Sequence, residues 1–252
     1  MSNQGDRERL GVFLYNPASC ASLERLLTPD RLSSYTARAG GDLSRALELY
    51  VWNTAVCGAL YGPLQAVEVA LRNVLHRELM QAFPPSWHDN ASFLQLDTRF
   101  SQKVEEAKDN IVETHFSRHA KQGSVSPQMR ATARLPGSGV LTTPRIIAEL
   151  SFGFWVRLLR PRFQTTLWGP ALHKAFPSGT KRSTVGGMVD RLLAMRNRIA
   201  HHEPIHDSSL AARYADLLLL AKWLSPDLEA WIKHHSRVDS LLADRPTPRQ
   251  VF

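Results

Sequence analysis

The apolar residues of this chain recur at helical spacing, and no stretch alternates apolar and polar residues as a β-strand does. The clearest stripe lies in a predicted helix from Leu64 to about Ala82 and consists of Leu64, Val67, Leu71, Leu75 and Leu79. Asp42 is the predicted cap of a preceding helix that ends near Ala59, because Gly58, Gly62 and Pro63 interrupt the pattern there. The sequence therefore predicts an all-α fold, a helical bundle with additional helices.

Further helices are predicted at about 22–39, 97–119, 143–160, from 184 to the residues before Pro204, 207–224 and 225–235. In the helix that begins at Thr143, Phe152, Trp155 and Val156 share one face and should belong to the core. A chain of 252 residues is long enough to bury a sizeable core, and we expect a single domain over 1–252.

The chain is basic, with a formal net charge of +8 and a pI near 9.9, which suits an anionic partner such as nucleic acid. Residues 117–142 hold no acidic residue and several glycines and prolines, which predicts a basic, mobile loop. This loop is either a solvated insertion or an RNA contact made through Arg118, Lys121, Arg130 and Arg134. The basic tail, 237–252, is predicted to be frayed.

Other features narrow the class of protein. Cys20 and Cys57 lie far apart without metal-ligand spacing, which indicates reduced, mostly buried thiols. No glycine-rich phosphate loop or zinc spacing is present, so we expect neither a cofactor nor a metal. No apolar run in the sequence is long enough to span a bilayer, and the first residues contain no apolar signal core. We therefore expect a cytoplasmic protein without a membrane partner.

The segment from Met195 to Ile205 combines arginines, an asparagine and histidines at one predicted helix end, which Pro204 terminates. On a helical projection the core stripe consists of Met188, Leu192, Met195 and Ile199. Asn197 and His201 fall on the opposite face, whereas His202 falls near the core stripe. The pattern predicts that His201 is exposed and that His202 is packed.

These residue types suit cleavage of RNA without a metal. A histidine can transfer the proton of the 2′-hydroxyl or of the leaving 5′-oxygen, and the negative end of the helix dipole stabilises a protonated imidazole there. A planar arginine, here Arg196, can stabilise the charge on the phosphate, and Asn197 can orient the histidine. Two copies facing each other in a symmetric dimer would supply two histidines. The alternative is a cationic helix end that only satisfies terminal carbonyls.

The run Arg196-Asn197-Arg198-Ile199-Ala200-His201-His202-Glu203-Pro204-Ile205 resembles the signature of the HEPN superfamily, most closely its Abi-like (abortive infection) branch of bacterial phage-defence proteins. The segment from Glu149 to Trp155, and Glu68 with Leu71-Arg72-Asn73, resemble two further elements of that branch. The resemblance implies a HEPN fold, a homodimer and a metal-independent endoribonuclease with Arg196, Asn197 and His201 in the site. It also implies a role in abortive infection or a toxin–antitoxin pair, with a small structured RNA or a protein antitoxin as the neutralising partner.

Several alternatives remain open at this point. Arg198 with His202 is a second register of the motif. Glu68 and Arg72 are either an ion pair that stabilises their helix or a second layer of residues that orients the motif. The rival functions are a non-catalytic RNA-binding or antitoxin-like scaffold and, more weakly, a regulated partner of a nucleotidyltransferase.

Overall fold

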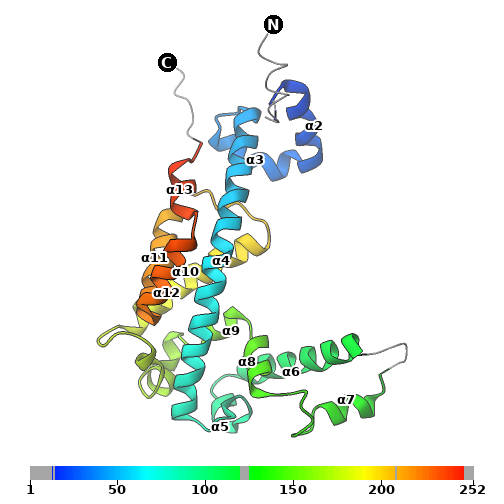
Figure 1. The fold of residues 1–252 in the computed structure, drawn as a ribbon, viewed down its shortest axis with the longest axis vertical. Coiled ribbons are helices and arrows are strands. Elements are labelled where there is room, and N and C mark those ends of the chain that lie inside the picture. The colour runs from blue at the N-terminus through cyan, green and yellow to red at the C-terminus, as the bar shows by residue number, and fades with distance from the viewer. Residues whose placement is uncertain (1–12, 14, 120–124, 208, 247–252) are drawn as a thin grey trace. The chain divides into compact units, whose positions relative to one another are not determined.

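The computed structural model describes residues 13, 15–119, 125–207 and 209–246, and over these ranges it is all-α, which confirms the predicted fold class. Figure 1 shows the elements in chain order. The first half comprises α2 (Pro17–Leu27), α3 (Pro29–Arg38), α4 (Leu43–Ala82), η1 (Trp87–Asp89), α5 (Ala91–Leu94), α6 (Thr98–His119) and α7 (Pro127–Ala133). The second half comprises α8 (Thr143–Glu149), α9 (Phe152–Arg157), η2 (Pro161–Phe163), η3 (Gln164–Trp168, a π-helical turn), η4 (Leu172–Ala175), α10 (Arg182–Ala200), α11 (Leu210–Leu224), α12 (Pro226–His235) and α13 (Val238–Ala243).

The chain divides into two compact units. The single domain over 1–252 stays a prediction. Unit 1 consists of Met1–Pro63, Arg196–Ala212 and His234–Phe252, and unit 2 of Leu64–Met195 and Arg213–Lys233. Four helices, α4, α10, α11 and α12, contain residues of both units. The whole Arg-Asn-Arg and His-His motif belongs to unit 1.

Unit 1 is built on α3 and the first half of α4. Leu32 and Tyr35 of α3 are fully buried, as is Val56 of α4. The indole N–H of Trp52 donates to the carbonyl of Leu241 at 2.6 Å, so α13 is bonded to α4.

The segment 237–252, predicted to be frayed, is ordered through most of its described part. Val238 is fully buried within α13, and the Arg245 guanidinium lies over the Trp52 ring, 5.1 Å from its centroid. The aromatic face of Trp52 attracts the Arg245 cation. The charges of the tail sequence alone do not reveal this contact, because Trp52 lies far away in the chain. Residues 247–252, with Arg249, lie outside the described residues.

The predicted break at Gly58, Gly62 and Pro63 is wrong, because α4 is continuous from Leu43 to Ala82. A proline in a helix interior costs roughly 3 kcal/mol. Buried residues nevertheless recur at helical spacing on both sides of Pro63: Val56, Leu60, Leu64, Val67, Leu71, Leu75 and Leu79. Burying each large apolar side chain contributes about 1.5–3 kcal/mol, so the continuous apolar face outweighs the proline.

The continuous α4 also changes the membrane assessment. Among the described helices, α4 alone is long and apolar enough to cross a membrane, and 33% of its most apolar window is buried inside the protein. Core helices of soluble proteins share this property. The sequence prediction considered uninterrupted apolar runs, whereas α4 meets the criterion over a window of a longer helix. The absence of a membrane partner stays a prediction.

The core of unit 2 is aromatic. Trp87, Phe93, Phe100 and Trp155 are fully buried, and Trp87 packs edge-on against Phe93, with centroids 4.7 Å apart. The predicted core residues Phe152, Trp155 and Val156 are all buried. They lie on α9, which is separate from α8 because Leu150 and Ser151 adopt extended conformations with ψ of 122° and 159°.

The segment 117–142 is not a loop throughout. The helix α6 runs to His119, and α7 occupies Pro127–Ala133, with the Ser126 hydroxyl accepting a hydrogen bond from the Met129 N–H. Ala133 and Val140 are buried in a hydrophobic cluster with side chains of α6 and α8, and α7 and α8 lie beside α6 (Figure 1). Burial of these few apolar residues orders a segment whose composition resembled a linker.

Candidate active site

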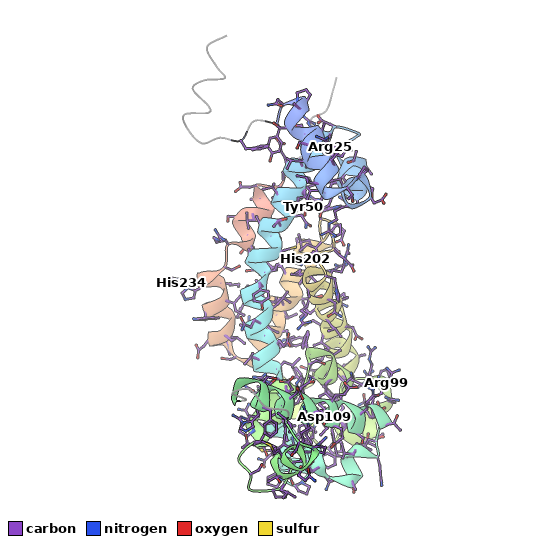
Figure 2. All side chains as sticks on the ribbon, turned by 90° about the vertical axis from the view of Figure 1, so that its right-hand side faces the viewer. Arg25, Tyr50, Arg99, Asp109, His202 and His234 are labelled. Carbon is purple, nitrogen blue, oxygen red and sulfur yellow. The ribbon has the colours of Figure 1, made fainter. Side chains whose placement is uncertain are left out.

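The end of α10 is closed by a Schellman motif. The N–H of His202 donates to the Ile199 carbonyl at 3.1 Å, and the N–H of Glu203 donates to the Arg198 carbonyl at 2.7 Å. His202 adopts a φ of 59°, in the left-handed region where glycine is usual. The helix therefore ends at Ala200, and His201 and His202 form the turn that follows it (Figure 2).

Asn197 and His201 are exposed, as the helical projection predicted. The His201 N–H still donates to the Asn197 carbonyl at 2.9 Å, so the two residues keep helical spacing. Side chains four residues apart have Cβ atoms about 5–6 Å from each other, within reach of a common ligand. Arg196, one residue before, is half-buried. This helix end therefore presents an imidazole and an amide on one open face.

The prediction that His202 is packed is wrong, because His202 is exposed. The projection assumed that helical geometry holds to this residue. The left-handed φ of His202 ends the helix before it and turns its side chain away from the core stripe. Met188, Leu192 and Met195 of that stripe are buried as predicted, and Ile199 is half-buried.

Arg198 is engaged with the segment that follows α10. Its guanidinium donates to the Pro204 carbonyl and forms ion pairs with Glu203, at 3.7 Å, and with Asp207, at 3.3 Å. A guanidinium has five donors in a fixed planar arrangement, which suits it to hold several acceptors of one loop. Arg198 therefore stabilises the turn, and this contact disfavours the register in which Arg198 acts on a substrate.

A buried asparagine supports the same segment from α4. Asn53 is 4% exposed, and its Oδ1 accepts a hydrogen bond from the Ile205 N–H at 2.8 Å. Its Nδ2 donates to Cys57 Sγ at 3.7 Å, so both ends of the amide are bonded. Burial raises the pKa of Cys57 to about 11, which keeps this thiol protonated and unreactive at neutral pH. Sequence reasoning missed Asn53, whose only signal was a polar residue among buried apolar positions of a helix.

His206 lies at the other end of the segment and is 7% exposed. Its Nε2 lies 3.3 Å from Ser34 Oγ, and the Tyr35 ring packs edge-on against it, with centroids 4.7 Å apart. The Arg245 guanidinium donates to the His206 carbonyl at 2.5 Å. Burial lowers the pKa of His206, and nearby Arg38, Arg245 and Arg198 lower it further. The neutral imidazole is therefore the folded form at neutral pH.

Glu68 and Arg72, the predicted second layer, belong to unit 2, whereas the motif belongs to unit 1. Arg72 donates to the Ala148 carbonyl at 3.4 Å, and its Nε donates to Asn73 Oδ1 at 3.4 Å. Arg72 thus contacts the last turn of α8. The role of Glu68 and Arg72 toward the motif stays a prediction.

Two of the arginines assigned to the basic loop are paired with carboxylates of α6. Arg130 bonds Glu113, and Arg134 bonds Asp109 at 2.6 Å and Glu105 at 3.2 Å. These contacts neutralise Arg130 and Arg134, whose acidic partners lie earlier in the chain, on α6. Lys121 lies outside the described residues, as does the Arg118 side chain.

Within the described ranges, no group of three or more His, Cys, Asp or Glu side chains is arranged to hold a metal ion. Cys20 and Cys57 are free thiols, the first buried and the second half-buried. The exposed groups at the end of α10 thus include the imidazoles of His201 and His202 and the amide of Asn197, with the half-buried guanidinium of Arg196 on the residue before Asn197. They can transfer a proton and hold an anion.

Comparisons with protein-family models, with curated proteins and with solved structures give no significant match to this chain.

Proposed function

We propose that the protein is a metal-independent endoribonuclease of the HEPN type that cleaves RNA at the end of α10. One observation carries the proposal. The Schellman motif leaves Asn197 and His201 exposed on one face, while Arg198 is engaged with the next segment. We therefore favour the register in which the exposed His201 acts with Arg196, which is half-buried.

In the proposed reaction the 2′-oxygen attacks the adjacent phosphorus, and the bond from phosphorus to the 5′-oxygen breaks. A base removes the proton of the 2′-hydroxyl, and an acid protonates the leaving 5′-oxygen. The products are a 2′,3′-cyclic phosphate and a 5′-hydroxyl, so no water is consumed. His201 transfers a proton, Arg196 stabilises the pentacoordinate phosphate, and Asn197 orients the imidazole or the ribose.

One chain exposes the adjacent His201 and His202 at this helix end, but in the proposed register only His201 acts, whereas the reaction needs an acid and a base. A homodimer that brings two copies of the motif together supplies both groups, and an isologous interface presents the same residues twice. We propose this arrangement, an HEPN-like bundle, a cytoplasmic location and an abortive-infection or toxin–antitoxin role as parts of the same hypothesis. Its neutralising partner would be a small structured RNA or a protein antitoxin.

The test is cleavage of total RNA and of a tRNA pool in EDTA by wild type, Arg196→Ala and His201→Ala, with the new ends mapped. His234→Ala is the matched control, because His234 is an exposed histidine near the end of another helix, α12 (Figure 2). We expect 2′,3′-cyclic phosphate ends from wild type and His234→Ala. Loss of an acid–base group or of a phosphate donor typically costs about 10²–10⁴-fold in rate, so the other two variants should be inactive in practice.

Circular dichroism and RNA binding must remain unchanged in His201→Ala for the loss to be chemical. Cleavage that persists in both variants would place the activity elsewhere. Absence of cleavage by the wild type, with RNA binding retained, would favour the non-catalytic RNA-binding scaffold.

A further inference from the structure

Four arginines gather around Ser34 and His206 in unit 1. Arg31, Ser34, Tyr35 and Arg38 occupy positions i, i+3, i+4 and i+7 of α3 and so share one helix face. His206 contacts Ser34 and Tyr35 on that face, and Arg245 bonds the His206 carbonyl.

The electrostatics place the remaining arginines in the same neighbourhood. Burial raises the pKa of Cys57 to about 11 and the pKa of Tyr35 to about 12, and Arg31 and Arg198 lie near enough to both groups to oppose that rise. Burial lowers the pKa of Arg245, and Arg38 lowers it further. Cations that repel one another and are partly buried would be stabilised by a bound anion. This arrangement is typical of a binding site.

Two carboxylates that follow α10, those of Asp207 and Glu203, are engaged with Arg198. Asp207 raises the pKa of Arg245, but its carboxylate already accepts from the Arg198 guanidinium and from the N–H and hydroxyl of Ser209. Glu203 also pairs with Arg198. Arg31 is half-buried and Arg38 is exposed, so both can be reached from solvent.

The middle of the cluster holds uncharged hydrogen-bonding groups. Burial keeps His206 neutral, and no other described residue bonds its Nδ1. Tyr35 is fully buried, and its hydroxyl has no hydrogen-bond partner in the described structure. Native proteins rarely leave buried polar atoms unbonded, so a ligand or water is expected beside them. Ser34, at the border of this interior and solvent, can donate to an anion.

We infer that Arg31, Ser34, Arg38 and Arg245 form a phosphate-binding subsite for the RNA backbone, separate from the site at Asn197 and His201. This inference rests on the proposed function only in the identity of its ligand as RNA. His206 belongs to the segment that begins five residues earlier with the His201-His202 turn. The subsite therefore binds a phosphate of the same strand beyond the cleaved one, and it reads no base because it contacts only backbone oxygens.

The experiment measures binding of a fluorescent 2′-O-methyl RNA by anisotropy at several KCl concentrations. This RNA has no attacking hydroxyl, so binding is measured without cleavage. Each phosphate contact contributes about 0.7 to the slope of log K against log salt on single strands. The double variant Arg31→Gln/Arg38→Gln should bind more weakly and lower that slope by about 1.4. Arg31→Lys/Arg38→Lys keeps both charges and should keep most of the slope.

The matched control is Arg77→Gln/Arg99→Gln, which removes two exposed arginines from unit 2 (Arg99 is labelled in Figure 2). Its slope should equal that of the wild type. The subsite is overturned if the wild type binds no RNA, if the Arg31/Arg38 double variant keeps the full slope, or if both doubles lose it equally.

The His201→Ala variant separates a failure of the phosphate-binding subsite from a failure of the proposed nuclease function. Arginine-dependent binding without His201-dependent cleavage would support the subsite and refute the nuclease. His201-dependent cleavage with an unchanged slope in the Arg31/Arg38 variant would do the reverse.

Discussion

The side-chain oxygen of Asn53 accepts a hydrogen bond from the Ile205 N–H at 2.8 Å, inside the protein, across 152 positions of the chain. This bond joins the first half of α4 to the segment that follows the candidate active site. Because Asn53 is 4% exposed, water does not take its place as the acceptor for the Ile205 N–H in the native state. We therefore expect this hydrogen bond to stabilise the position of the chain just after the His201-His202 turn.

Replacing Asn53 with Ala should lower the free energy of unfolding by about 1–3 kcal/mol, because the Ile205 N–H is left buried and unbonded. Urea denaturation followed by circular dichroism measures this change. Thr54→Ala is the neighbouring control: Thr54 is exposed, and its hydroxyl bonds only the Tyr50 carbonyl of its own helix. Thr54→Ala should lower the free energy of unfolding by no more than about 0.5 kcal/mol. Equal effects of the two substitutions would show that the bond to Ile205 contributes nothing specific.

Replacing His202 with Gly should raise the free energy of unfolding by about 1 kcal/mol, because glycine adopts a positive φ without the clash that a Cβ causes. The proposed register further predicts that His202→Gly retains RNA cleavage. Chemical denaturation and the EDTA cleavage assay measure the two effects. His201→Gly, one residue earlier, is the control and should gain no stability. A stable but inactive His202→Gly protein would indicate that Arg198 and His202, rather than Arg196 and His201, carry out the reaction.

Acid should destabilise the fold through two buried histidines. Burial lowers the pKa of His88 and of His206 below the ordinary 6.5, so the unfolded chain binds protons more readily than the folded protein. Their contribution to stability is therefore complete above about pH 7. It is lost as pH falls below 6.5, by up to about 1.4 kcal/mol per pH unit for each histidine.

Urea unfolding between pH 7.5 and 5.5 measures this dependence, in a range where ordinary carboxylates do not titrate. His88→Gln and His206→Gln should each flatten the curve. His234→Gln, which changes an exposed histidine, should keep the wild-type slope. A wild-type stability that stays constant down to pH 5.5 would contradict the argument.

The sequence by itself determined the features that depend on a few neighbouring residues. The stripe from Leu64 to Leu79 is buried, and Asp42 caps α4 by accepting from the Arg45 N–H at 3.2 Å. The exposure of Asn197 and His201 also followed from sequence, because the fixed helical period places them opposite Met188 and Met195. Local geometry and amphipathic spacing are sufficient for such predictions.

Only the tertiary structure decided which residues from distant parts of the chain meet. Pro63 remains helical because apolar side chains on both sides of it are buried. Arg134 is neutralised by carboxylates of α6. Ser34 meets His206 across 172 positions. No local period encodes these contacts, because their free energy comes from burying groups that are adjacent only after the chain has folded. The sequence therefore located the candidate reactive groups, and the packing selected which arginines hold the turn and which remain accessible to an anion.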